Sequence, residues 1–281
     1  MRRALACIAA ATALAAAAVA GKQLDARARM GEGEQDLLYL PNGKYLKLLS
    51  LGHASLVADG VYIWAIQHYS DYTRASRGQY VEHVFGDVIA ELDPRYVDPY
   101  WLGSLILIVE NQDLDAGLRL LDKGFEANPG EWIFPYLAGW ECARASDFAR
   151  AVVYFDRAGK VPDAPPHVKR MKAGMFARSG DLRDAVAAWA EILGAPSSDD
   201  SSKDIARRQL RTLQVRLDVQ TLNDAVQRFR QAAGRNPSSL AELRSEGLMN
   251  AIPVDVDGNP YDYDPRSGKV SSVTERVLGN P

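Results

Sequence analysis

Three pentapeptides follow one another at a constant interval of 34 residues: Asp-Leu-Asp-Ala-Gly at 113–117, Asp-Phe-Ala-Arg-Ala at 147–151 and Asp-Leu-Arg-Asp-Ala at 181–185. The same interval relates the apolar residues Leu121, Phe155 and Trp189, and also Ile108, Cys142 and Phe176. Several columns in one register indicate an internal repeat. Such a period predicts a stack of helix-turn-helix units, each of which buries one face against its neighbour.

Each column has a physical interpretation. The leading Asp residues are expected in the tight turn between two helices, where a short acceptor side chain caps the free N–H groups of the second helix; they are Asp113, Asp147 and Asp181. The small residues four positions later are expected where the paired helices approach most closely; they are Gly117, Ala151 and Ala185. Pro129 and Pro162 are expected to close the second helices, since proline cannot continue a helix.

Residues 98–199 resemble the tetratricopeptide repeat family. Gly139 matches its small first-helix position, Gly180 its inter-helix turn, and Ala151, Phe155 and Pro162 its second-helix pattern, with the proline one residue early. The departures are Gly117 and Gly124 in place of alanines, Cys142 in place of an aromatic residue, and Leu105 in place of the first-helix glycine. The resemblance implies a mainly α fold, an antiparallel helix-pair solenoid wound into a superhelix.

The resemblance also implies a binding groove, because first-helix residues line the inner wall of this family's superhelix. Carried over by position, the groove residues are Leu102, Ile106 and Glu110, then Ile133, Tyr136, Trp140 and Arg144, then His167, Arg170 and Arg178. Apolar and aromatic residues give way to cations along this set, which suits an extended peptide or a partner helix. In the alternative, the protein's own helices, for instance residues 203–233, cover Ile133, Tyr136 and Trp140.

The N-terminal residues 1–20 have the pattern of a secretory signal. Arg2 and Arg3 precede an uncharged apolar stretch that ends in Ala18 and Ala20, so we expect cleavage after Ala20. The alternative is an uncleaved anchor in the inner membrane, since the stretch is almost long enough to span a bilayer. Both interpretations export the rest of the chain, to the periplasm of a bacterial envelope.

The remaining chain divides by composition. We expect a lead-in at 21–50, a degenerate helical repeat at 51–97, three repeats at 98–202, capping helices at 203–233, and a tail at 234–281. In the tail, Ser239 and Glu242 form a capping-box pattern that predicts a short helix. The alternation of Tyr261 and Tyr263 with aspartates then predicts a small β-hairpin that returns at Val270, so the extension is α+β.

The tail resembles the end of the globular head of type II secretion pseudopilins, in which a helix, a Pro-rich step and an Asp-Gly-Asn-Pro-Tyr stretch precede a hairpin. The match here is Asp257-Gly258-Asn259-Pro260-Tyr261. Calcium sites occur in those heads, which makes Asp255, Asp257, Asp262 and Asp264 weak candidate ligands. We favour solvated turn carboxylates, because the twelfth position from Asp255 is Arg266 rather than the Glu of an EF-hand.

Charge and motif content narrow the function. A formal net charge of −3 leaves no cationic excess for a nucleic-acid backbone. The four histidines, His53, His68, His83 and His167, form no metal-binding helix pair with Glu, and neither a nucleophile turn nor a phosphate loop occurs. We therefore predict a scaffold or adaptor without catalytic activity or cofactor, which binds protein partners during assembly of a membrane, pilus or secretion complex. The alternative is a structural subunit permanently built into a larger membrane-associated complex.

Overall fold

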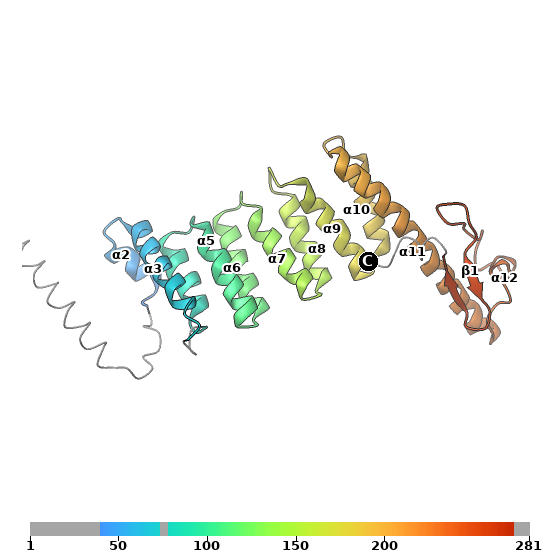
Figure 1. Ribbon diagram of the computed structural model, residues 1–281, viewed down its shortest axis with the longest axis horizontal. Helices are drawn as coiled ribbons and strands as arrows, with labels where there is room; N and C mark the ends of the chain where they lie inside the picture. Colours follow the sequence, from blue (N-terminus) through green and yellow to red (C-terminus); the bar gives the residue numbers. More distant parts are fainter. Residues whose placement is uncertain (1–39, 74–77, 273–281) are drawn as a thin grey trace, which may run out of the picture. The chain divides into compact units, whose positions relative to one another are not determined.

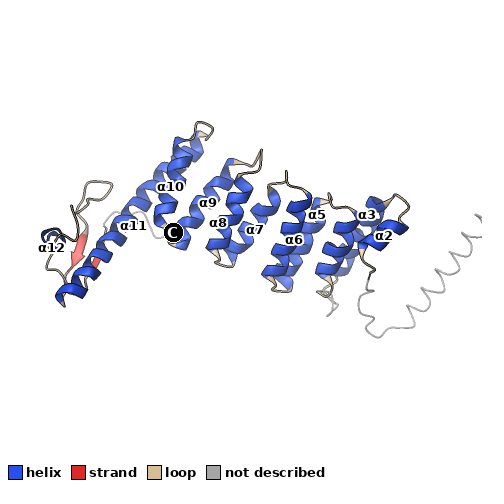
Figure 2. Ribbon diagram, turned by 180° about the vertical axis from the view of Figure 1, so that it is seen from behind, coloured by secondary structure: helices blue, strands red, loops and turns tan. Residues whose placement is uncertain are grey.

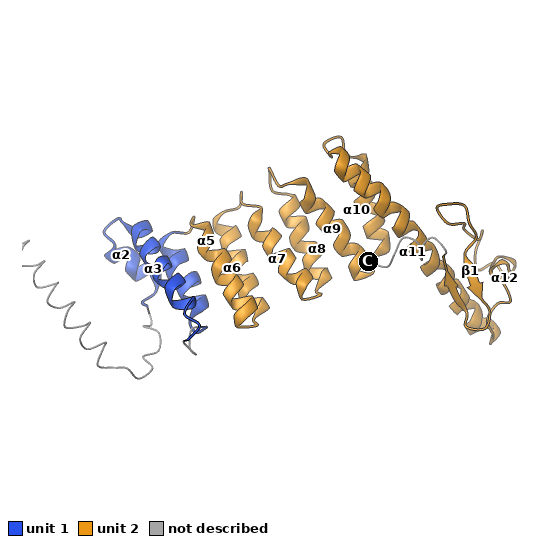
Figure 3. Cartoon of the chain, in the orientation of Figure 1, with its two compact units in different colours: residues 1–93 blue, residues 94–281 orange. Residues whose placement is uncertain are grey.

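The computed structural model describes residues 40–73 and 78–272, which are mainly helical with one small antiparallel sheet near the C-terminal end (Figures 1 and 2). The chain divides into two compact units, residues 1–93 and 94–281 (Figure 3). The predicted signal or anchor at 1–20 lies outside the described residues. Within the described ranges, no helix is long and apolar enough to cross a membrane.

The described part of the first unit contains four helical segments: α2 (Gly43–Leu49), α3 (Ala54–Tyr69), the π-helical segment η1 (Glu82–Ile89) and α4 (Ala90–Leu92). Its core joins Ala58 and Ala65 of α3 to the fully buried Phe85 of η1 and its neighbours. The lead-in expected at 21–50 contains α2, because Asn42 accepts a hydrogen bond from the Lys44 N–H and starts a helix. A side chain at Gly43 would overlap the backbone of η1, so only glycine allows this approach.

The second unit begins with paired helices that each pack on the next along the chain (Figure 1). They are α5 (Val97–Leu105) with the π-helical η2 (Ile106–Glu110), α6 (Leu114–Ala127), α7 (Ile133–Arg144), α8 (Phe148–Gly159), α9 (Pro166–Ser179) and α10 (Leu182–Gly194). Each pentapeptide of the sequence repeat therefore starts the second helix of a pair. The column residues Leu121, Phe155 and Trp189 are all buried.

The turns between paired helices share one backbone conformation. Gln112, Ser146 and Gly180 occupy equivalent positions and all have positive φ, at 57°, 61° and 93°. The next residue caps the second helix in two turns: Asp113 accepts from the Ala116 N–H at 2.8 Å and Asp147 from the Arg150 N–H at 3.0 Å.

The capping prediction is wrong for the third turn. Asp181 makes no cap hydrogen bond, and its carboxylate accepts from the Ser179 hydroxyl at 2.7 Å instead. The Ser179 hydroxyl takes the place of a helix N–H as the donor to the Asp181 carboxylate. The other two turns have no hydroxyl at this position, because the equivalent residues are Asn111 and Ala145.

The predicted close approach of paired helices is confirmed. A side chain at Gly117 would overlap Ile108, and Ala151 and Ala185 are fully buried at the equivalent positions. Gly139 lies against the ring of Phe155, where a Cβ would come within 3.1 Å of the ring. These columns are therefore small because a second helix occupies the space of a side chain.

The first helix of the first pair contains one residue more than the 34-residue register predicts. The Asp147 N–H bonds to the carbonyl of Cys142, five residues back, whereas the Asp113 N–H bonds to that of Leu107, six residues back. The π-helical η2 accommodates the extra residue. As a result Ser104 is buried, and Leu105, which we expected in place of the family's glycine, is more than one-third exposed.

A single helix, α11 (Asp200–Ala233), replaces the capping helices expected at 203–233. Its N-terminal half packs with α9 and α10 through Ala206 and Leu213. Its C-terminal half packs with the tail through Leu222, Val226 and Phe229. The same helix thus packs on the last helix pair with one half and contributes to the hydrophobic core of the tail with the other.

The tail contains the predicted short helix, α12 (Leu240–Ser245), and the predicted hairpin of β1 (Asp262–Asp264) and β2 (Lys269–Ser271), in which Tyr263 pairs with Val270. The capping box is displaced by one residue. Glu242 accepts from the N–H and hydroxyl of Ser238 rather than from Ser239, because it also pairs with Arg235. Tyr261 anchors the tail to α11 by donating to Asp218 at 2.9 Å.

Candidate functional site

A cleft of about 620 Å³ opens where the first helices of the second and third pairs face α11. Its walls come from α7, α9, α10 and α11; we call it the arginine cleft. Its lining residues are Trp140, Ala143, Arg144, Arg170, Met171, Gly174, Met175, Ala177, Arg178, Trp189, Gln209, Thr212, Leu213 and Arg216. The cleft therefore combines cations with aromatic and thioether side chains.

The cleft brings together four of the ten predicted groove residues. Trp140 and Arg144 come from α7, and Arg170 and Arg178 from α9. Sequence reasoning missed the contribution of α11, whose Gln209, Thr212, Leu213 and Arg216 form the opposite wall. The available signal was the helical periodicity of 203–233, but it does not say against which helices that segment packs.

Two further predicted residues, Tyr136 and His167, form an aromatic cluster outside the cleft. Tyr136 lies edge-on to His167, with ring centroids 5.4 Å apart, and packs on Phe155 at 5.7 Å. Ile133 and Tyr136 are half-buried. Tyr136 and His167 therefore join neighbouring helix pairs, and Trp140 remains 44% exposed.

The three residues predicted from the first pair are displaced by the extra residue in η2. Leu102, Ile106 and Glu110 do not line the arginine cleft, and Ile106 is buried in the core. The two helices can be aligned on the carbonyls that accept from the turn aspartates, those of Leu107 and Cys142. In this alignment the positions equivalent to Tyr136, Trp140 and Arg144 are Trp101, Leu105 and Val109. All three are exposed apolar residues, four apart on one helix face.

Positive charge dominates the arginine cleft. Its four arginines are accompanied by no carboxylate among the lining residues, although the whole chain carries a net negative charge. Arg144 Nε lies 2.9 Å from Glu141 Oε2, an ion pair without hydrogen-bond alignment, and Arg170 bonds to the Ser202 hydroxyl. Arg178 and Arg216 form no ion pair with any described residue. Two guanidinium groups are thus available to an anionic ligand.

The wall of the cleft also contains an unused hydrogen-bond donor. Trp189 is 4% exposed, and its indole N–H has no acceptor among the described residues. A buried donor without a partner costs free energy in the unbound protein.

Two of the side chains that could perform catalysis are buried or hydrogen-bonded. Cys142 is fully buried, and burial raises the pKa of its thiol to about 11, so the nucleophilic thiolate is absent at neutral pH. His83 bonds to the Leu40 carbonyl at 2.7 Å and to Asp87 at 3.2 Å. In the ranges that the structure describes, no three His, Cys, Asp or Glu side chains could hold a metal ion.

The four candidate calcium ligands of the tail form no metal-binding cluster among the described residues. Asp255 is buried and accepts from the N–H groups of Asp257 and Asn259, at 3.0 and 2.7 Å. Asp257 pairs with Arg211 at 2.6 Å. Hydrogen bonding from Ser267 lowers the pKa of Asp264, and Asp262 lies exposed on β1. These carboxylates do not meet at one point.

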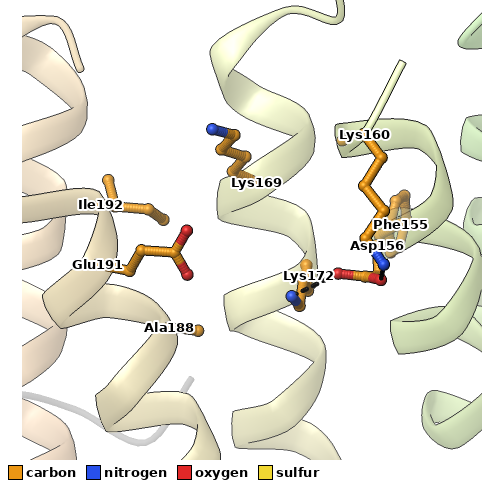
Figure 4. A pocket seen from close by; sticks show the side chains of 9 residues that line it. Phe155, Asp156, Lys160, Lys169, Lys172, Ala188, Glu191 and Ile192 are labelled. Atoms are coloured by element: carbon orange, nitrogen blue, oxygen red, sulfur yellow. Dashed lines mark hydrogen bonds and ion pairs between the residues drawn. The ribbon is translucent and has the colours of Figure 1, made fainter. Parts of the chain in front are cut away.

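A second, smaller hollow of about 210 Å³ lies between α8, α9 and α10 (Figure 4). It contains Lys160, Lys169 and Lys172, but Asp156 pairs with both Lys160 and Lys172 at 2.6 Å. Partial burial raises the pKa of Asp156, and the two lysine hydrogen bonds outweigh this and lower it. Because its cations are largely neutralised, this hollow is a weaker anion site than the arginine cleft.

Comparison with known proteins does not identify the chain. No protein-family model matches it, and no curated protein matches it significantly in sequence. The geometry and charge of the arginine cleft are therefore the basis for a functional proposal.

Proposed function

We propose that the helix pairs form a tetratricopeptide-type solenoid. Three equivalent features at a 34-residue interval support this: the positive-φ turn, the Asp that follows it, and the small residue beneath the first helix. Sequential packing from α5 to α11 supports it as well. Such a stack exposes the first helices along one face, and the first helices α7 and α9 contribute Trp140 and three of the four cleft arginines.

We further propose that the protein is a non-catalytic scaffold of the cell envelope, exported to the periplasm, which holds a protein partner during assembly of a membrane, pilus or secretion complex. The observation that carries the binding role is the arginine cleft, with four arginines, an exposed tryptophan and no lining carboxylate. The pseudopilin-like tail favours a secretion or pilus setting. The proposal requires no cofactor.

The ligand that best fits the cleft is an acidic segment of a partner protein with one apolar or aromatic anchor. Arg178 and Arg216 have no competing ion pair among the described residues, so they are available for carboxylates. Trp140 is nearly half-exposed and offers a flat apolar surface to the anchor.

Capture of the partner from envelope extract tests the cleft. The double variant Trp140→Ala, Arg144→Ala removes two exposed side chains, and we expect recovery of the partner to fall at least about tenfold. The matched control is Val153→Ala, Arg183→Ala, which changes an exposed apolar residue and an exposed cation on the second helices α8 and α10. Equal recovery by both double variants would refute the cleft as the binding site.

Size measurement in mild detergent distinguishes the alternative function. A constitutive large complex would favour a permanent structural subunit, and an isolated chain favours a scaffold.

A further inference from the structure

The first unit exposes an apolar tip formed by the end of α2, the following turn and the first residues of α3. The tip consists of Tyr45, Leu48, Leu49, Leu51 and Leu56, whose exposed fractions are 62, 78, 73, 87 and 70%. Scattered apolar side chains are common on protein surfaces, but large ones gathered within twelve residues of chain usually mark a contact surface.

Packing of α2 determines which of its faces is exposed. Gly43 is buried against Val88 and Glu91, and the Lys47 ammonium donates to the Glu91 carbonyl at 3.2 Å. Tyr45, Leu48 and Leu49 stand at i, i+3 and i+4 and form a single stripe away from Gly43. The stripe therefore lies outward because the opposite side of α2 is occupied.

Leu51 is held outward at a conformational cost. Its φ of 50° is unfavourable for a residue with a branched side chain, and it is nevertheless the most exposed large apolar residue of the tip. Gly52 follows at φ 94°, so the turn projects Leu51 between α2 and α3. A protruding leucine suits insertion into a soft apolar layer better than it suits a preformed groove.

The segment that forms the tip carries only positive charge. Residues 40–58 contain Lys44 and Lys47 and no Asp or Glu, and the first carboxylate that follows is the exposed Asp59 of α3. Farther along α3, Ile63 and Ile66 are 57% and 38% exposed. Leucines and a tyrosine flanked by lysines are the composition of segments that lie in the interfacial layer of anionic membranes.

We propose that this tip binds the surface of an anionic lipid bilayer, with Leu48, Leu49 and Leu51 in the acyl boundary and the lysines at the headgroups. This inference goes beyond partner binding by the arginine cleft and does not depend on it. Nineteen residues, 21–39, separate residues 1–20 from Leu40, and a fully extended chain of this length spans at most about 70 Å. If residues 1–20 remain as an anchor, the tip can reach the same bilayer; if they are cleaved, the tip itself provides the membrane contact.

Vesicle flotation tests the proposal with the chain from Gly21 onward, which retains every described residue. Vesicles of phosphatidylglycerol and phosphatidylethanolamine should bind this chain, and neutral phosphatidylcholine vesicles should bind it less, with attraction weakened by salt. Leu48→Glu with Leu49→Glu should reduce binding at least about tenfold, because carboxylates cannot enter the apolar layer. Val153→Glu, an exposed apolar residue of α8, is the matched control and should bind as the unmodified chain does.

Two results would overturn the proposal. One is absence of binding to anionic vesicles, or equal binding by the Leu48/Leu49 variant with its helical circular dichroism and melting temperature unchanged. The other is a dimer of the unmodified chain in light scattering that the Leu48/Leu49 variant converts to a monomer, which would assign the tip to a second copy. Neither result bears on the arginine cleft, whose residues are unchanged in every variant.

Discussion

Three turn residues with different side chains, Gln112, Ser146 and Gly180, adopt the same left-handed backbone conformation. All have positive φ, which costs an ordinary residue about 1 kcal/mol or more and costs glycine little. Only the third position carries the residue best suited to the conformation. The first two turns keep their shape because packing of the paired helices over-determines it.

The substitution Ser146→Gly should therefore raise the free energy of unfolding by about 1 kcal/mol, since it relieves the left-handed conformation. Urea denaturation followed by circular dichroism measures this change. The control is Ala187→Gly, an exposed residue in the middle of α10, which should lower stability by about 1 kcal/mol because glycine is a poor helix former. A destabilised Ser146→Gly variant would contradict the interpretation of the turn.

At the scale of elements, η2 shows how a repeat absorbs one extra residue. The insertion rotates the first helix of the first pair relative to the register of the others, by about 100°. Ile106 turns into the core, and Trp101, Leu105 and Val109 take the exposed face. The π-helical turn keeps the core contacts on both sides of the insertion.

Deletion of Val109 should shorten the distance in sequence between the Leu107 carbonyl and the turn aspartate Asp113 from six residues to five. Five is the spacing in the second pair, between Cys142 and Asp147. We expect the deleted protein to fold with a free energy of unfolding within about 1 kcal/mol of the original, as a π-bulge becomes a regular helix. Deletion of Ala143 in α7, which has no such bulge, should cost about 4 kcal/mol or more because it rotates Phe134 and Ala138 out of the core. Equal damage from both deletions, measured by urea denaturation, would argue against an inserted residue.

At the scale of the second unit as a whole, α11 connects two hydrophobic cores. One surrounds Trp189 and Leu213, and the other surrounds Phe229, Leu243 and Val270. Because α11 is one continuous helix, the two cores cannot move relative to each other without breaking helical hydrogen bonds. The arginine cleft depends on this continuity, since α11 supplies one wall.

Gln220→Pro should uncouple the two cores. The exposed Gln220 lies just beyond the residues of α11 that pack on α10, and proline there removes a helix hydrogen bond and clashes with the preceding turn, at a cost of about 3 kcal/mol. Calorimetry should then resolve two transitions in place of a single cooperative one for this unit. Gln220→Ala retains the helix and is the control; one unchanged transition in the proline variant would exclude coupling through α11.

Features set by neighbours in the chain were predictable from the sequence. The positions of the inter-helix turns, the caps at Asp113 and Asp147, the small residues at Gly117 and Ala151, and the tail hairpin all follow from local spacing. Four residues that the tetratricopeptide resemblance implied for the groove line the arginine cleft. Helical periodicity and turn formation depend on residues close together in the sequence, so the sequence of one chain is enough to predict them.

Only the tertiary structure decided the features that depend on which surfaces meet. The extra residue in η2 could not be detected by aligning the repeats, because Leu107 and Ile108 are both apolar and both buried. Only the packing shows which of them is equivalent to Cys142. Arg216 enters the cleft because α11 folds back on α9, and the tip of α2 is exposed because Gly43 faces η1. These outcomes arise from contacts between distant segments, whose free energies depend on shape as well as on residue type.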